Sequence, residues 1–258
     1  MSAAYGAGRR DAPVSSLYDR IGRSYSATRE EDPRLAAAVH AALGDARTVL
    51  NVGAGAGSYE PEDRYVVAVE PSAQMRAQRR TPAVIGVAEA LPFDDDSFDA
   101  AMAMATIHQW PDLERGLREL RRVARGPVVI LTWDGPTIPE FWLGEYVPEL
   151  LASESRRVPA VADVVAVLGD VVDTALPIPV DCVDGFIEAY YGRPEALLDP
   201  EVRARQSAWS FADPGAVERG LQRLNDALES GEWDARHGHL RTQPFYTGAL
   251  RLLEVDPA

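Results

Sequence analysis

Apolar residues in the central part of the chain come in short runs that longer polar stretches separate. These runs are rich in valine and alanine, and they predict buried strands at residues 48–52, 65–69, 83–87, 98–104 and 127–133. Between the last two runs, four apolar residues at helical spacing predict an amphipathic helix: Leu113, Leu117, Leu120 and Val123. Strands that alternate with helices are typical of an α/β protein with a parallel sheet.

The flanking segments predict further helices. Leu35, Val39 and Leu43 have helical spacing, and an earlier helix is expected at residues 15–25. In the second half, the apolar pattern predicts helices at residues 140–157, 161–168, 184–198 and 214–228.

Two further strands are expected near the C-terminal end. Residues 171–182 predict an edge strand, because prolines interrupt the run, and residues 245–255 predict a closing strand. A helical block at about residues 184–240 then lies between these two strands. We therefore expect a doubly wound, mostly parallel sheet of seven strands.

Three glycines at alternate positions follow the first predicted strand. Gly53, Gly55 and Gly57 have no Cβ atoms, so a ligand can lie against the backbone of the turn that they form. A strand that enters a glycine turn and then a helix N-terminus is a nucleotide-binding arrangement. The spacing G-x-G-x-G stops short of the dinucleotide fingerprint G-x-G-x-x-G, and by itself it also fits a purely structural turn.

A carboxylate ends the second predicted strand. Glu70 lies roughly 20 residues past the glycine turn, where it can accept hydrogen bonds from the two hydroxyls of a ribose. In a parallel sheet, the carboxyl ends of the strands meet at one edge, and ligands bind there. The residues expected at that edge are Gly53, Glu70, Ala88, His108 and Asp134.

The next segments are more specific. Residues 86–93 read Gly-Val-Ala-Glu-Ala-Leu-Pro-Phe, residues 97–99 read Ser-Phe-Asp, and residues 106–110 read Thr-Ile-His-Gln-Trp. With the glycine turn and Glu70, this series resembles the class I S-adenosylmethionine-dependent methyltransferases of the branch that modifies small molecules, the methyltransferase type 11-like proteins. The resemblance covers residues 48–133, about a third of the chain.

Two positions depart from this family. Asn51 stands where the family usually has Asp or Glu, and Val87 stands where it often has an Asp that contacts the adenine amine. Asn51 can still donate and accept hydrogen bonds. Val87 cannot, so adenine recognition is expected to shift to the backbone around Ala88 and to Glu89.

The resemblance implies a Rossmann-like methyltransferase fold that binds S-adenosyl-L-methionine and releases S-adenosyl-L-homocysteine. It also implies an N-terminal helical lid, whose Tyr and Arg touch the methionine part of the cofactor, and a helical insertion that roofs the substrate pocket. The cofactor-binding residues that it implies are Tyr25, Arg29, Asn51, Gly53, Ala54, Gly55, Gly57, Glu70, Pro71, Ala88, Glu89 and Ala105.

These expectations divide the chain into four parts. Residues 1–46 form the tail and lid helices, residues 47–183 the cofactor-binding core, residues 184–243 the helical cap, and residues 244–258 the closing strand of the core. A chain of 258 residues, of which 46% are hydrophobic, fits one large domain or one domain with a cap.

Charge and cysteine content narrow the function classes. The formal net charge of −14 disfavours non-specific binding to nucleic acid or to an anionic membrane. The single cysteine, Cys182, excludes an internal disulfide and favours a cytoplasmic location. No run of apolar residues approaches a membrane span. We expect a small-molecule substrate, no nucleic-acid or membrane partner, and a monomer or homodimer.

His108 is the candidate catalytic base. It follows a predicted strand end next to the expected methyl position, and the unperturbed pKa of histidine, near 6.5, suits proton removal at neutral pH. An alternative is that His108 only orients the substrate. The expected substrate-binding residues are Tyr18, His108, Trp142, Tyr146 and Tyr190, since apolar pockets are usually lined by aromatic residues. His237 and His239 lack the spacing typical of a metal pair, so no metal is expected.

The leading hypothesis is methyl transfer to a small, largely apolar molecule through an oxygen, nitrogen or carbon acceptor, with secondary metabolism as the expected context. A second hypothesis is a protein that binds S-adenosylmethionine without methyl transfer, such as a sensor or an accessory subunit. A third is a nicotinamide-dependent oxidoreductase, against which the Ala-Glu-x-Leu-Pro-Phe segment and the shortened glycine spacing both argue.

Overall fold

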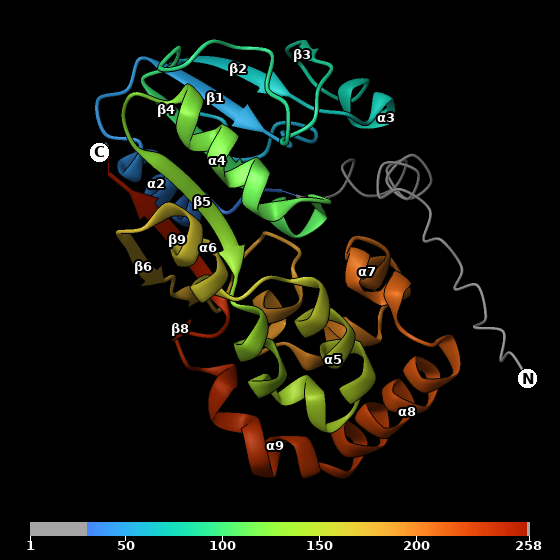
Figure 1. Ribbon diagram of the computed structural model, residues 1–258. Coiled ribbons are helices and arrows are strands. Elements are labelled where there is room, and N and C mark those ends of the chain that lie inside the picture. Colours follow the sequence, from blue (N-terminus) through green and yellow to red (C-terminus); the bar gives the residue numbers. More distant parts are fainter. Residues whose placement is uncertain (1–29, 257–258) are drawn as a thin grey trace, which may run out of the picture.

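The computed structural model describes residues 30–256 (Figure 1). The helix expected at residues 15–25 lies outside the described residues. So do three of the predicted site residues, Tyr18, Tyr25 and Arg29.

Seven strands form one sheet. Their order is β3 (Ala83–Val84), β2 (Tyr65–Val69), β1 (Thr48–Val52), β4 (Ala100–Met104), β5 (Val128–Trp133), β9 (Leu250–Val255) and β6 (Val171–Ala175). The strands from β3 to β5 are parallel, whereas β9 runs antiparallel to both of its neighbours. This topology confirms the predicted doubly wound, mostly parallel sheet of seven strands.

Alternate residues of the central strands face two separate apolar layers, as the period of two in a strand requires. On one face, Val49, Met102 and Leu131 pack with helix α2 (Pro33–Ala42) and with the C-terminal insertion. On the other face, Leu50, Ala101 and Ile130 pack with α4 (Leu113–Val123) and α6 (Val161–Leu168). The helix predicted from the spacing Leu113-Leu117-Leu120-Val123 is confirmed, and all four of its apolar residues are buried or packed against this layer.

The helix expected directly after the glycine turn does not form. Residues 53–64 run through turns straight into β2. Glycines hold positive φ angles at three places in this segment, and Pro61 removes a further backbone donor, so the segment disfavours a helix. Between β2 and β3 lies only the short α3 (Ala73–Arg76), and no helix separates β3 from β4.

The predicted helical insertion packs together with residues 135–157, which precede β6, and the two segments form a cap in the lower half of Figure 1. Its regular helices are α5 (Pro148–Arg157), α7 (Pro200–Ala204), α8 (Pro214–Ser230) and α9 (Glu232–His237). Its 3-10 helices are η2 (Gly135–Glu140), η3 (Trp142–Glu145), η4 (Ile187–Tyr190), η5 (Pro194–Leu198), η6 (Ser207–Phe211) and η7 (Gly238–Arg241), whereas η1 (Ile107–Gln109) follows β4 in the core.

Two of the helices predicted in the second half of the chain were wrong in form. The single helix expected at residues 140–157 is broken before Pro148, because the residue that precedes a proline avoids helical backbone angles. The helix expected at residues 184–198 is two 3-10 helices instead: η4 ends before Gly192, and η5 begins at Pro194. A Cβ on Gly192 would lie 2.5 Å from the Leu240 carbonyl oxygen, so the chain is drawn close to η7 here.

The last two predicted strands are each split in two. Within residues 171–182, β6 ends at Ala175, and Ile178–Pro179 forms β7, which pairs with β8 (Phe245–Tyr246) in a separate two-stranded sheet. Proline cannot continue the ladder, which explains the first break. The second break lies at Gly248, where a Cβ would lie 2.1 Å from Oε1 of Glu188.

Within residues 30–256, no helix is long and apolar enough to cross a membrane. The sheet topology places β9 in the core and the segment before it in the cap. The exact four-part division of the chain stays a prediction.

Candidate functional site

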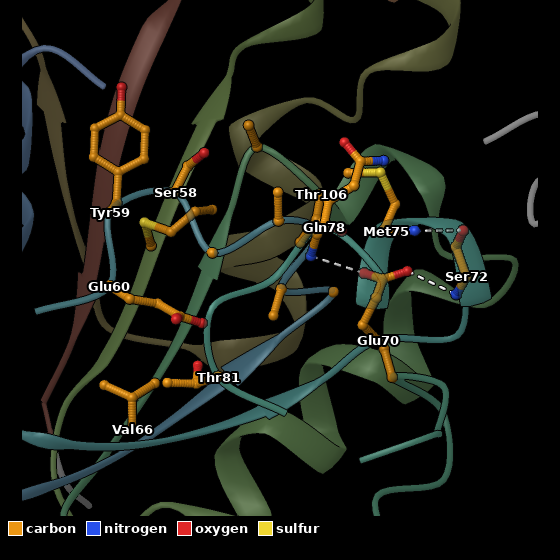
Figure 2. Close-up of a pocket in the computed structure, with 18 of the residues that line it drawn as sticks. Ser58, Tyr59, Glu60, Val66, Glu70, Ser72, Met75, Gln78, Thr81 and Thr106 are labelled. Carbon is orange, nitrogen blue, oxygen red and sulfur yellow. Dashed lines mark hydrogen bonds between the residues drawn. The ribbon is translucent and has the colours of Figure 1, made fainter. Parts of the chain in front are cut away.

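A large cavity opens at the carboxyl ends of the parallel strands. This cavity, called the larger cavity below, has a volume of about 1340 Å³. It lies around the glycine turn, between the ends of β1, β2 and β4. The strand order reverses between β1 and β4, and ligands bind at such a switch point. Figure 2 shows Glu70, Ser72, Met75 and Thr106 among the side chains that surround this space.

The glycine turn is shaped for close approach. Gly53, Gly55 and Gly57 have φ angles of 68°, 51° and 105°, which side chains rarely allow. A Cβ on Gly53 would lie 2.2 Å from Oγ1 of Thr106, so this glycine is required for packing. A Cβ on Gly55 would meet only the terminal methyl of Met75, at 3.3 Å. The open side of Gly55 therefore faces the cavity, and a ligand can lie there.

Glu70 is buried, with 6% of its surface exposed, which differs from the exposed position expected for a strand tip. Its Oε2 accepts a hydrogen bond from the Gly55 N–H at 2.8 Å, and its Oε1 accepts one from the Ser72 N–H at 2.8 Å. Burial raises the pKa of this carboxyl, and the backbone donors and two nearby arginines oppose that rise. Each oxygen has a second lone pair, so Glu70 can still accept hydrogen bonds from a ligand.

Asn51 does not line the cavity, but it is tied to the turn that does. It is buried at the end of β1, and its Nδ2 donates to Oε1 of Glu60 at 2.9 Å. Glu60 forms a bidentate pair with Nη2 of Arg79, at 2.7 and 2.8 Å. Nη1 of Arg79 also donates to the carbonyl oxygens of Ala54 and Gly55. Asn51 is thus connected, through Glu60 and Arg79, to the backbone of the glycine turn.

The far end of the larger cavity is lined by Val87, Ala88 and Glu89. Ala88 is buried, whereas Val87 is 46% exposed and forms a short bridge with Ala90. Glu89 accepts a hydrogen bond from the backbone N–H of Asp112 at 3.3 Å, which fixes its side chain at the cavity edge. Backbone groups and one carboxylate are therefore available for an adenine ring at this end.

A smaller cavity, of about 90 Å³, lies between the sheet and the cap. Three aromatic side chains, Trp133, Phe141 and Phe186, form much of its wall. His108 lies against Trp133 edge-on, with ring centroids 6.5 Å apart. The polar residues of the wall are His108, Glu154, Glu188, Arg205, Gln206 and Ser207.

The two cavities meet at Ala105. This residue lines both, and it has a φ angle of 52°, which turns the chain sharply after β4. His108 lies three residues further, in η1, on the side of the smaller cavity. A group held at the glycine turn and a molecule in the aromatic cavity would therefore approach each other at Ala105.

The structure brings most of the predicted cofactor residues together. Those that line the larger cavity are Gly53, Ala54, Gly55, Gly57, Glu70, Pro71, Ala88, Glu89 and Ala105. Asp134 lies at the same edge, directly after β5, but it does not line the larger cavity. Its carboxylate accepts from the Val161 N–H and the Thr137 hydroxyl and so stabilises the start of α6 and η2.

Of the predicted substrate residues within residues 30–256, only His108 lines the smaller cavity. Trp142 and Tyr146 are buried in the core of the cap, where the indole N–H of Trp142 donates to the Tyr191 carbonyl at 3.0 Å. Tyr190 lies under the guanidinium of Arg193. We therefore leave these three aromatic residues out of the proposed site.

Sequence reasoning missed the polar part of the smaller cavity. Glu154, Glu188 and Gln206 lie on α5, on η4 and just before η6, so no short motif joins them. Turns of 3-10 helix also lack the apolar period that reveals a helix face. Glu60 and Arg79 were missed for the same reason, since only the folded chain shows that they form an ion pair.

Known methyltransferases share both sequence and fold with this chain. A family model described as a methyltransferase domain matches residues 50–130. A crystal structure of a proposed methyltransferase from an antibiotic biosynthesis pathway of Anabaena variabilis is 30% identical, with a TM-score of 0.82, and the match covers 89% of this chain and 99% of that one.

Two curated relatives match a smaller part of this chain. The 2-methyl-6-phytyl-1,4-hydroquinone methyltransferase 2 of rice, Oryza sativa subsp. japonica, is 33% identical over 40% of this chain and 33% of its own length. The demethylmenaquinone methyltransferase of Mycolicibacterium gilvum is 33% identical over 48% of this chain and 61% of its own length. The chain thus spans about a third of the rice protein and less than two thirds of the bacterial one.

These matches include the strand, the glycine turn and the Ala-Glu-x-Leu-Pro-Phe segment that form the larger cavity, and the structural match extends through the cap. The chain belongs to the class I S-adenosylmethionine-dependent methyltransferases.

Proposed function

We propose that this protein transfers a methyl group from S-adenosyl-L-methionine to a small, largely apolar molecule. The observation that carries this proposal is the position of Ala105, which lines both the cavity of the glycine turn and the aromatic cavity. A donor in the first cavity and an acceptor in the second would be aligned across this residue, and alignment is the main requirement of the reaction.

The residues of the larger cavity fit the cofactor. The open side of Gly55 leaves room against the backbone, Glu70 offers lone pairs to the ribose hydroxyls, and Ala88 and Glu89 lie where adenine would bind. When bound, S-adenosylmethionine supplies an electrophilic methyl group on a sulfonium. The chain's own part is to hold donor and acceptor in line and to exclude water.

His108 is proposed to act on the acceptor. It lines the aromatic cavity three residues past Ala105 and can take a proton from an acceptor hydroxyl, amine or activated carbon. If His108 is the base, His108→Gln should lower kcat by about 10²–10⁴-fold, which is the typical contribution of a general base. A change in KM with an unaltered kcat would show that it only orients the substrate.

The wall of the smaller cavity supports an aromatic or other flat apolar acceptor. The names of the two curated relatives describe enzymes that act on a 2-methyl-6-phytyl-1,4-hydroquinone and on demethylmenaquinone. We propose an acceptor of the same general type, acted on in the cytoplasm. The alternative, a protein that binds the cofactor without methyl transfer, gains no support from the paired cavities.

Binding and stability measured on the same variants test the cofactor site. Glu70→Ala should weaken binding of S-adenosylhomocysteine at least tenfold, since hydrogen bonds to a charged group contribute about 1.5–3 kcal/mol each. Glu70→Asp should weaken it less, because the charge stays. Both variants should also lose some thermal stability, because Glu70 holds two backbone N–H groups.

Glu149→Ala is the matched control, since this exposed carboxylate on α5 lies away from both cavities. It should leave affinity and stability unchanged. If the Glu70 variants lost stability but kept full affinity, Glu70 would be only a structural cap of α3. Incubation with labelled S-adenosylmethionine and cell extract distinguishes the two hypotheses. An enzyme would form S-adenosylhomocysteine, whereas a protein that only binds the cofactor would not.

A further inference from the structure

The smaller cavity contains two buried polar side chains that the proposed reaction does not use. Gln206 is 6% exposed and Glu188 is 7% exposed, and both line the cavity among aromatic and aliphatic neighbours. Within residues 30–256, Nε2 of Gln206 and Oε2 of Glu188 have no hydrogen-bond partner. A buried polar atom without a partner is costly, so these two atoms require an explanation.

The direction of the Gln206 amide is fixed by its neighbour. The indole N–H of Trp209 donates to Oε1 of Gln206 at 2.7 Å, and an indole N–H can only donate. The amide oxygen must therefore face Trp209, which leaves the NH₂ group as the available end. This assignment does not depend on which way the amide is drawn. Gln206 lines the cavity, so the wall includes a residue whose donor has a known direction and no partner within residues 30–256.

Glu188 is held in a similar way. Its Oε1 accepts a hydrogen bond from the Ala249 N–H at 2.9 Å, while its second oxygen stays unpaired among the described residues. Burial raises the pKa of Glu188 to about 7, so its carboxyl carries a proton below about pH 7. The protonated carboxyl would be a second donor in the same apolar space.

The size of the cavity limits what these donors can bind. A volume of about 90 Å³ is far below the ~300–1,000 Å³ of sites that enclose drug-sized ligands. One ring with a short substituent fits this volume, whereas a larger molecule would place only its ring there. The walls of Trp133, Phe141 and Phe186 suit the face or edge of such a ring.

We propose that the methyl acceptor is an aromatic ring bearing an oxygen, and that this oxygen accepts a hydrogen bond from Nε2 of Gln206. Glu188 offers a second contact for an oxygen elsewhere on the ring. This inference rests on the proposed function and names Gln206 as the residue that selects the substrate. A hydrocarbon without the oxygen would leave the amide unpaired and would be rejected.

Two probes of nearly equal shape test the role of the oxygen. Acetophenone carries a carbonyl oxygen where α-methylstyrene carries a methylene group. Their affinities for the protein saturated with S-adenosylhomocysteine can be measured by ligand-observed NMR titration. Acetophenone should bind about tenfold more tightly, which corresponds to about 1.4 kcal/mol, as expected when a buried donor is left unpaired by the hydrocarbon.

Substitutions of Gln206 test whether this residue causes the preference for acetophenone. Gln206→Leu should bring the affinity ratio of the two probes close to one, whereas Gln222→Leu, on the exposed face of α8, should leave it unchanged. Gln206→Met keeps a side chain of similar length without the amide donor, so it should also abolish the preference. Thermal unfolding identifies any variant that does not fold, and Gln206→Met then serves in place of Gln206→Leu.

Three results would overturn the inference: equal affinity of the two probes, an unchanged ratio in the folded Gln206 variants, or binding of neither probe. Tighter binding of 1-phenylethylamine, a cation of the same size, would show instead that the carboxylates select an amine. Calorimetry with S-adenosylhomocysteine alone separates the two proposals. If the cofactor product binds and the probe ratio is one, only this inference fails, whereas absence of cofactor binding removes the proposed function itself.

Discussion

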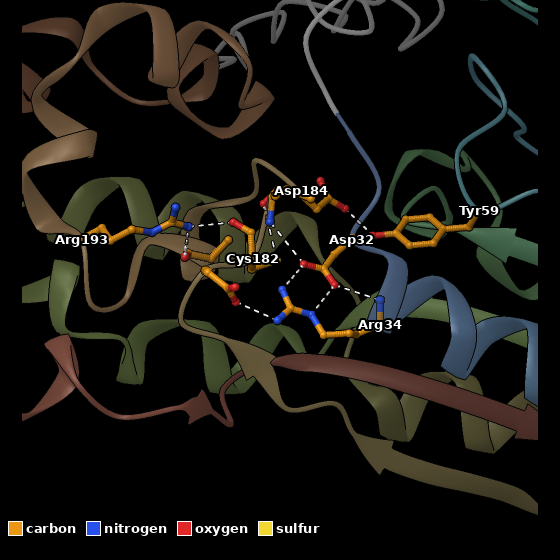
Figure 3. A network of polar contacts seen from close by, with 9 residues as sticks. Asp32, Arg34, Tyr59, Cys182, Asp184 and Arg193 are labelled. Atoms are coloured by element: carbon orange, nitrogen blue, oxygen red, sulfur yellow. Dashed lines mark hydrogen bonds and ion pairs between the residues drawn. The ribbon is translucent and has the colours of Figure 1, made fainter.

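The hydroxyl of Tyr59 donates a hydrogen bond to the buried carboxylate of Asp184, 125 residues further along the chain (Figure 3). Tyr59 follows the glycine turn and has a positive φ of 65°. Asp184 precedes Gly185 and Phe186, which line the smaller cavity. Around this bond, Figure 3 shows Asp32, Arg34, Cys182 and Arg193 in one polar network. The bond thus joins the cofactor turn to the cap.

Removal of this hydroxyl should destabilise the protein. Tyr59→Phe keeps the ring and deletes one donor to a buried carboxylate, at a cost of about 1–3 kcal/mol. For a protein of this size, the melting temperature should fall by about 2–4 °C per kcal/mol. Tyr65→Phe, at a tyrosine that is 69% exposed, is the matched control. Equal melting temperatures of the two variants would show that the Tyr59–Asp184 bond does not stabilise the fold.

The positive φ of Gly55 allows a clean test of the cofactor cavity. Gly55→Ala should lose about 1–2 kcal/mol of stability from backbone strain, and it should also weaken binding of S-adenosylhomocysteine, because the new methyl group enters the cavity. Gly44→Ala has a similar φ of 56° and no atom within 4 Å of the new Cβ, and Gly44 lies outside the cavity lining. It should show the same loss of stability with unchanged affinity. The two variants compared by calorimetry and thermal unfolding separate strain from steric exclusion.

The parts of the fold that local pattern determines were predictable. The strands of the core and the helix at residues 113–123 follow from the spacing of apolar residues in sequence. The structure places them where that spacing predicts, except that the strand expected at residues 83–87 forms only at Ala83–Val84. The glycine turn and Glu70 were also correctly expected at one edge of the sheet. Each of these features depends on a few neighbouring residues.

The features that failed depend on contacts between distant segments, or on glycines and prolines that break a helix without changing the apolar spacing. The loss of a helix after the glycine turn is accompanied by the ion pair of Glu60 with Arg79, which no local pattern shows. In the cap, prolines and close backbone contacts break the predicted helices into 3-10 turns. The aromatic residues expected at the substrate cavity were chosen by type alone, and type does not distinguish the cap core from the cavity wall.

The Glu60–Arg79 pair should be essential to the glycine turn. The Arg79 side chain is only 1% exposed, so Arg79→Met leaves the Glu60 carboxylate without its partner and should cost about 3–5 kcal/mol. The double variant Arg79→Met with Glu60→Gln should be more stable than Arg79→Met alone, because no unpaired charge remains. Urea unfolding of the single and double variants forms a double-mutant cycle. Additive losses would show that the two side chains act independently.

The buried Glu188 should make stability depend on pH. Its pKa in the folded protein is raised by burial to about 7, against an ordinary value of 4.5, while Arg251 opposes the rise. The carboxyl also faces Tyr246, whose own pKa burial raises. The folded protein therefore holds the Glu188 proton more tightly than the unfolded chain. Stability from this group is fully present below about pH 4.5 and is lost as the pH rises to about 7.

Glu188→Gln removes this dependence, because the amide cannot titrate yet its oxygen still accepts from the Ala249 N–H. The variant should gain stability relative to the native protein as the pH rises from about 4.5 to 7.5, by up to about 3 kcal/mol. Groups that titrate equally in both proteins cancel in this comparison. Urea unfolding of both proteins at pH 5, 6, 7 and 8 measures the difference directly. Parallel stability curves would mean that Glu188 keeps an ordinary pKa, and its carboxyl would then be an anion rather than a donor in the smaller cavity.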